Sequence, residues 1–150
     1  MDKDLRKEIN DATRTTMNPE WQELVKAKAD APMSKTVIVP GTRIAAGNPP
    51  VARAGNSTRK LSGGVAPVDL YRAEEFGTKD REKTKTYTRK NSRNGGTHQV
   101  TRRTRRQLPA YNAAGRVAYP AFAKLAPRMA KLWTQIVVRK AHEAFEKGSK

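Results

Sequence analysis

Residues 83–89 read KTKTYTR, the most regular stretch in this chain of 150 residues. Successive side chains of a β-strand point to opposite faces, so a strand here would put the three threonines on one face. The other face would carry Lys83, Lys85, Tyr87 and Arg89. A glycine-containing turn over residues 91–96 follows, and residues 97–104 (THQVTRRT) can return as the partner strand. The stretch therefore predicts a long, basic β-hairpin.

Positive charge is concentrated in this expected hairpin. Residues 79–106 hold eleven Lys and Arg residues and two acidic ones, Asp80 and Glu82, which gives +9 of the chain's formal net charge of +17. Like charges this dense on paired strands destabilise the pairing unless a partner supplies counter-charge. We therefore expect contact with DNA or with an acidic partner, rather than a merely solvated face. The expected contact residues are Lys83, Lys85, Tyr87, Arg89, Lys90, Arg93, Arg102, Arg103, Arg105 and Arg106.

Toward the C-terminus, apolar residues recur at helical spacing from Leu125 to Phe145. Pro120 and Pro127 fit the entry to a helix, and Gly148 fits its end. We expect one long helix here, packed on the core, with packing against a neighbouring subunit as the alternative. The core residues expected from this segment are Leu132, Trp133, Ile136 and Phe145.

Apolar residues also recur at helical spacing near the N-terminus. The pair Asn18-Pro19 matches an N-cap followed by proline at the first helical position. We predict a kinked or broken pair of helices over residues 3–30, with Trp21 and Leu24 in the core.

The middle zone, residues 34–109, carries strand and loop signals. A β-branched run over residues 36–44 predicts a strand with a turn in its middle. Residues 68–73 predict another short strand, followed by Phe76 as a core anchor. Residues 47–64 are rich in Gly, Pro, Asn and Ser, with too few apolar side chains to fold on themselves. We expect them to form an extended surface arm or loop.

Signals of catalysis and metal binding are missing from the sequence. The chain has no cysteine, which removes disulfides, thiolate nucleophiles and the usual zinc-finger ligand sets. His98 and His142 have no second ligand at metal-binding spacing, and Glu74-Glu75 in a strand would point to opposite faces. No segment has the length of a signal-peptide core or a membrane span. We therefore expect a non-enzymatic protein with no cofactor, no metal and no membrane contact.

The fold class expected from these segments is α+β, in a single domain over residues 1–150. N-terminal helices (1–32) and a long C-terminal helix (110–150) should pack on a small, mostly antiparallel sheet. The zone between them (34–109) should supply the strands, the extended loop arm and the basic hairpin. With 36% hydrophobic residues, we expect partial order that neighbours complete.

The order of segments resembles the head-tail joining family of small tail-completion proteins from long-tailed bacteriophages. Each motif that carries the resemblance is weak alone, but together they span nearly the whole chain. They are residues 40–50 (PGTRIAAGNPP), 61–64 (LSGG), 75–77 (EFG), 107–109 (QLP), 115–122 (GRVAYPAF), 126–128 (APR) and 132–133 (LW). No catalytic residues come with this family.

The resemblance implies a structural virion protein that assembles in the bacterial host cytoplasm into a ring at the phage neck. The ring would join the DNA-filled head to the tail and contact other neck and tail proteins, such as adaptor, stopper and tail tube. Loops and arms of such subunits typically clasp their neighbours. The expected interface residues are Arg43, Asn48, Pro49, Pro50, Arg53 and Arg59.

The charge departs from the family pattern, because neck channels often carry acidic groups along which DNA slides. The hairpin could instead face acidic neighbouring proteins. Contact with double-stranded DNA would be nonspecific, since nothing in the sequence looks like a recognition helix. The alternative function is a small basic nucleic-acid-binding protein of ribosomal or nucleoid type.

Overall fold

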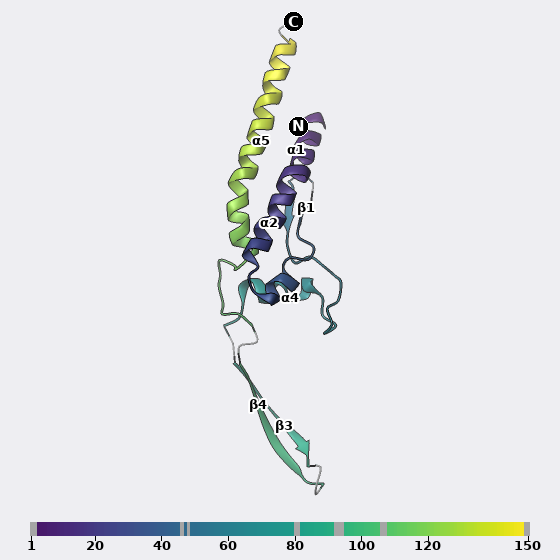
Figure 1. Ribbon diagram of the computed structural model, residues 1–150, viewed down its shortest axis with the longest axis vertical. Coiled ribbons are helices and arrows are strands. Elements are labelled where there is room, and N and C mark those ends of the chain that lie inside the picture. Colours follow the sequence, from purple (N-terminus) through teal and green to yellow (C-terminus); the bar gives the residue numbers. More distant parts are fainter. Residues whose placement is uncertain are drawn as a thin grey trace.

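The computed structural model describes residues 3–45, 47, 49–79, 82–91, 95–105 and 108–148. The chain combines N-terminal helices, a long C-terminal helix and two small antiparallel sheets, which confirms the predicted mixed fold class. In order, the elements are α1 (Lys3–Ala12), a π-helical turn η1 (Thr13–Met17), α2 (Asn18–Lys28), α3 (Pro32–Val37), β1 (Arg43–Ala45), β2 (Val51–Arg53), α4 (Pro67–Phe76), β3 (Glu82–Lys90), β4 (Thr97–Arg105) and α5 (Ala118–Gly148). The molecule is elongated, with the tip of α5 at one end and the β3–β4 hairpin at the other (Figure 1).

The N-terminal helices form one continuous rod with a π-helical turn in its middle, so the helical prediction for residues 3–30 is confirmed as far as Lys28, whereas the predicted break is wrong. Buried Thr13 begins that turn, and its hydroxyl donates to the carbonyl of Ile9 and accepts a hydrogen bond from Trp133 Nε1 at 3.0 Å. The predicted N-cap at Asn18 is wrong, because the rod has no end there. Asn18 Oδ1 instead accepts the backbone N–H of Ile44 at 2.8 Å, which fastens β1 to the rod.

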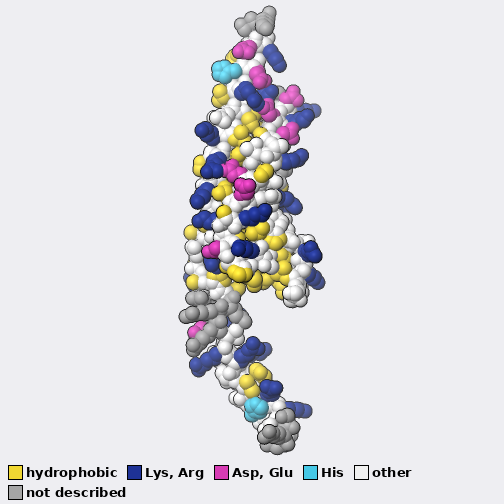
Figure 2. Space-filling model, viewed as in Figure 1, with side chains coloured by type: hydrophobic (Ala, Val, Ile, Leu, Met, Phe, Trp, Pro, Cys, Tyr) yellow, Lys and Arg dark blue, Asp and Glu magenta, His cyan; other side chains and the backbone are white. Residues whose placement is uncertain are grey.

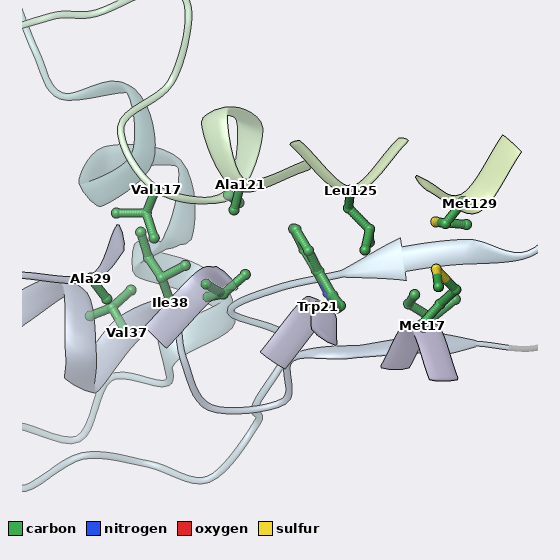
Figure 3. Packing of buried hydrophobic residues seen from close by; sticks show 12 residues of the cluster. Met17, Trp21, Ala29, Val37, Ile38, Val117, Ala121, Leu125 and Met129 are labelled. Carbon is green, nitrogen blue, oxygen red and sulfur yellow. The ribbon is translucent and has the colours of Figure 1, made fainter. Parts of the chain in front are cut away.

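The core lies where the rod meets α5. Met17, Trp21 and Val25 of the rod pack against the inner face of α5, and α3 closes the base of this layer (Figure 3). The inner face of α5 consists of Ala121, Leu125 and Met129. Trp21 is 2% exposed, and its Nε1 donates to the carbonyl of Arg53, so its polar atom is satisfied. Full burial of one large apolar side chain stabilises the fold by about 1.5–3 kcal/mol.

Most of the predicted core residues lie in or against this core. Trp21 and Ile136 are buried, while Leu24, Leu132 and Trp133 are partly buried. Phe76 is half-buried at the edge, with its ring centroid 5.2 Å from that of Tyr119. The prediction for Phe145 is wrong: its side chain is 77% exposed, because α5 extends past the end of α1 and has no described segment to pack on there (Figure 1).

The predicted strand over residues 68–73 is wrong, because these residues lie in α4. The predicted strand over residues 36–44 is partly right: residues 36 and 37 end α3, a turn follows, and residues 43 and 44 belong to β1. Residues 32–37 form α3 and residues 67–76 form α4, and the two helices pack against each other. Each begins with a proline at its first position after an extended residue, Ala31 or Ala66, and this geometry favours a helix over a strand. The β-branched Val37 and Ile38 are fully buried, so tertiary burial overrides their strand propensity.

The two sheets are separate, and each has two antiparallel strands. In the first sheet, β1 pairs with β2, so the predicted arm is wrong for residues 51–53, which form a strand. Residues 54–64 contain no helix or strand, in agreement with the predicted loop. Trp21 and Asn18 hold this small sheet against the rod through their hydrogen bonds to the backbone of Arg53 and Ile44.

The most densely bonded side chain in the described part of the chain is the carboxylate of Glu75. It is fully buried at the end of α4 and accepts hydrogen bonds of 3.0–3.2 Å from the backbone N–H groups of residues 116–119. These N–H groups precede and begin α5, where the helix dipole also favours a negative charge. Gly115, with φ +76°, lets the chain pass this carboxylate, since a Cβ there would lie 2.5 Å from Glu75 Oε1.

Substitution Glu75→Gln tests this cap. A carboxamide would turn an NH₂ group toward backbone N–H donors, so at least one donor loses its acceptor in a buried site. We expect the free energy of unfolding to fall by about 3 kcal/mol, measured by chemical denaturation. The exposed carboxylate Glu146 supplies the control, Glu146→Gln, which should change it by less than about 0.5 kcal/mol. Equal effects of the two substitutions would contradict the capping role.

Tyr71 gives a pH-dependent test of the same region. Burial, then the negative charge of Glu75, then Tyr119, raise the pKa of the Tyr71 hydroxyl from 10.0 to about 12. The folded state therefore holds this proton more tightly than the unfolded state. The resulting stability is fully present below pH 10 and is lost as pH rises from 10 to 12. Between about pH 9 and about pH 11, the free energy of unfolding of Tyr71→Phe, measured by urea denaturation, should fall less than that of the wild type. An equal fall in the two proteins would refute the raised pKa of Tyr71.

Candidate functional site

The candidate site is the β3–β4 hairpin, which projects from the body of the molecule (Figure 1). Its strands pair over nine residues each, from Glu82 opposite Arg105 to Lys90 opposite Thr97. Every side chain of β3 is exposed, so the hairpin has no core of its own. The structure thus confirms the predicted long hairpin and its alternation. Figure 2 shows Lys and Arg side chains along its length.

The register places one set of cations around Tyr87. Residues directly opposite each other share a face, and Lys85 lies opposite Arg102, Tyr87 opposite Val100, and Arg89 opposite His98. Lys83, opposite Thr104, belongs to the same face. We call this set the Tyr87 face; it carries no acidic residue. Tyr87 is 42% exposed at its centre.

The opposite face is richer in threonine. Thr86 and Thr101 face each other there with their hydroxyl oxygens 3.1 Å apart, and Lys90 and Arg103 of the predicted contact set point to this side. The predicted contact residues are therefore divided between two faces. Arg105 has a described backbone in β4, whereas Arg93 and Arg106 lie outside the described residues.

The cations of the Tyr87 face repel one another, and the described residues place no carboxylate beside them. Same-face neighbours on a strand are about 7 Å apart, within the Debye length of about 8 Å at physiological ionic strength. Among the residues that the structure describes, no carboxylate lies within ion-pairing distance of Lys83, Lys85, Arg89 or Arg102. A polyanion that binds this face would relieve the repulsion, and Tyr87 offers a flat ring for packing or stacking.

The root of the hairpin is fixed to the body by backbone contacts. The N–H of Thr78 donates to the carbonyl of Pro109 at 3.0 Å, and Thr78 forms a bridge with Ala110. Gly77 precedes this bridge with φ +69°, and a Cβ there would lie 2.4 Å from the Ala110 carbonyl oxygen. A residue without a side chain is therefore required where the chain turns from α4 into the hairpin.

The predicted subunit-interface residues fall into two groups. Arg43 and Arg53 lie directly opposite each other on β1 and β2, both exposed, an arrangement of like charges that favours an external counter-charge. Pro49 and Pro50 line an apolar groove beside α5, whereas Arg59 lies in the loop beyond β2 and not at the groove. Asn48 lies outside the described residues.

The groove, with a volume of about 470 Å³, lies between α5 and the segment that leads into β2. Its walls include Pro50, Val51, Tyr119 and Phe122, with Trp21 at its base. Phe122 is 42% exposed and packs edge-on against Trp21. Sequence reasoning missed this surface, because the groove forms only where Pro50 and Val51, far away in the sequence, lie beside Tyr119 and Phe122 of α5.

Other chemistry has little support in the described residues. They contain no group of three or more His, Cys, Asp or Glu side chains that could hold a metal ion, and none of their helices is long and apolar enough to cross a membrane. Glu74 and Glu75 lie on a helix and not on the expected strand. The Ser34 hydroxyl donates to the Glu74 carboxylate at 2.6 Å, and the Glu75 carboxylate accepts hydrogen bonds from backbone N–H groups. Comparison with protein-family models, curated proteins and solved structures found no match to this chain.

Neutralisation of the Tyr87 face tests the hairpin as a binding surface. A variant with Lys83, Lys85, Arg89 and Arg102 changed to Gln should unfold with a free energy no lower than that of the wild type, because these exposed side chains lose only their mutual repulsion. Its affinity for duplex DNA or polyglutamate should fall, and the salt dependence of binding should become shallower. Fluorescence titrations over a salt series would measure both.

The matched control removes the same charge from the body: Lys26, Lys28, Arg59 and Lys60 changed to Gln, all exposed positions. This variant should bind polyanions nearly as the wild type does. Equal losses in the two variants would mean that net charge, and not the hairpin, governs binding.

Proposed function

We propose that this chain is a structural protein of a tailed-phage neck, where copies form a ring that joins the DNA-filled head to the tail. The hairpin carries the proposal. It is nine residues long on each strand, has only exposed side chains on β3 and belongs to a segment with a net charge of +9. An isolated two-stranded hairpin is marginally stable in water, so the β3–β4 hairpin becomes fully ordered when it docks on a neighbour.

The motifs that carry the family resemblance support this proposal by their positions. Residues 75–77 end α4 and turn toward the hairpin, and of the motif 107–109 the described residues 108 and 109 follow β4. Residues 115–122 begin α5 and are held by the Glu75 carboxylate. The similar segments therefore frame the root of the hairpin and the start of the long helix, the two features by which a ring subunit would reach its neighbours.

A second candidate function is nucleic-acid binding by the monomer. The observation that favours it is the Tyr87 face, where an exposed aromatic ring lies among four Lys and Arg residues, as on surfaces that bind single strands by stacking. The two candidates differ in their requirement for assembly. A ring subunit needs other copies to function, whereas a nucleic-acid-binding monomer does not.

Electron microscopy and light scattering of the purified chain, alone and mixed with isolated tails, separate the two candidates. The neck proposal predicts rings of uniform diameter, either free or at the head-proximal end of the tails. Binding to DNA should be weak at physiological salt, because the contacts are nonspecific. A chain that stays monomeric with tails present, and that binds RNA or DNA tightly, would refute the ring.

A further inference from the structure

α5 has a second apolar face. At 3.6 residues per turn, Ala123, Ala130, Val137, Val138, Ala141 and Phe145 fall within an arc of about 120°, and we call this set the outer stripe. No charged residue of α5 lies in the same arc, although Lys and Arg are frequent elsewhere on this helix. The inner face, with Leu125, Met129 and Ile136 buried, points to the opposite side.

All six residues of the outer stripe are exposed, with Val138 at 50% and Phe145 at 77%. A soluble helix normally carries charged or polar residues on the side opposite its core, and a helix that is apolar on both sides is normally buried on both sides. The outer stripe therefore has the composition of a contact surface and lacks its partner in the single chain.

The size of the surface fits a contact between proteins. From Ala123 to Phe145 the outer stripe runs along about 34 Å of the helix. A strip about 10 Å wide over that length offers on the order of 340 Å², somewhat under half of the roughly 800 Å² that each partner buries in a standard interface. The apolar groove adds further area on the neighbouring side of the same helix, through Tyr119 and Phe122.

The chemistry of the stripe favours a protein over a lipid surface. Half of its six residues are alanines, which gain little from transfer into lipid but let another backbone approach closely. The stripe is convex and the groove, lined by Pro50, Val51 and Phe122, is concave, and both are free of charge. One chain thus carries both halves of a heterologous contact, which a closed ring requires.

We infer that the outer stripe of α5 packs into the apolar groove of a second copy of this chain. This inference rests on the proposed ring, and it names the two surfaces that meet at each junction between subunits. The repeated contact passes from stripe to groove around the ring, so each subunit uses both surfaces once.

The test places one negative charge on each surface. Val138→Glu blocks the stripe, and Val51→Glu, at a 48% exposed position, blocks the groove. Gln135→Glu adds the same charge to an exposed site of α5 outside the stripe and is the matched control. Circular dichroism should show the wild-type helix content in all three variants. Sedimentation velocity should give assembled wild type and control, and monomers for both blocked variants.

Mixing decides whether the two surfaces meet each other. The Val138→Glu chain keeps an intact groove and the Val51→Glu chain keeps an intact stripe, so their mixture should form dimers that neither forms alone. An assembled Val138→Glu variant, or a mixture that stays monomeric while the wild type assembles, would overturn the inference and leave the ring proposal intact.

The remaining outcomes separate the inference from the ring proposal. Open filaments of wild type that both Glu variants abolish would overturn the ring and keep the stripe-to-groove contact, since a heterologous contact that does not close gives filaments. A wild type that stays monomeric even with isolated tails present would overturn both. Binding of mixed phosphatidylcholine and phosphatidylglycerol vesicles by a monomeric wild type, lost in Val138→Glu, would assign the stripe to a lipid surface instead.

Discussion

The buried carboxylate of Glu75 is the interaction on which the rest of the structure depends. It joins the end of α4 to the start of α5, more than 40 positions later in the chain, through hydrogen bonds from four backbone N–H groups. The segment that contains the hairpin lies between Glu75 and the start of α5. A single buried carboxyl group therefore closes a long loop, satisfies the N-terminus of the longest described helix and fixes where the hairpin leaves the body.

The body and the hairpin are stabilised by different interactions. In the body, the side chains of Trp21, Val25 and Leu125 are almost completely buried, and this packing fixes the N-terminal rod against α5. The hairpin instead has exposed side chains on β3, a high density of like charge and strands that are joined mainly by backbone pairing. The molecule thus consists of a well-packed body and a charged, exposed hairpin. The outer stripe of α5 is an exposed apolar surface on the body.

The sequence predicts the features that depend on local periodicity. The alternation of residues 83–89 predicts the hairpin and its faces, and helical spacing predicts both the N-terminal rod and α5. The number of charges on the hairpin also follows from the sequence alone. Which of Arg102 and Arg103 shares the face of Lys85 depends on the register of β4, which only the paired strands supply.

Features that depend on tertiary contacts could not be predicted. Val37 and Ile38 have the residue types of a strand, but α3 forms there because α4 packs on it and Ser34 reaches Glu74. The role of Glu75 is invisible in sequence, since its partners are backbone groups. Phe145 matches the apolar repeat of α5. It is exposed because α5 extends past the end of α1, and this depends on the lengths of both helices.

In the proposed ring, the hairpin of a lone subunit becomes fully ordered only when it docks on a partner. Amide hydrogen exchange of β3 and β4, measured in the monomer and in the assembled ring, measures this change. We expect fast exchange in the monomer, strong protection in the assembled ring, and unchanged protection in the core around Trp21 and Leu125. Equal protection of the hairpin in both states would contradict it.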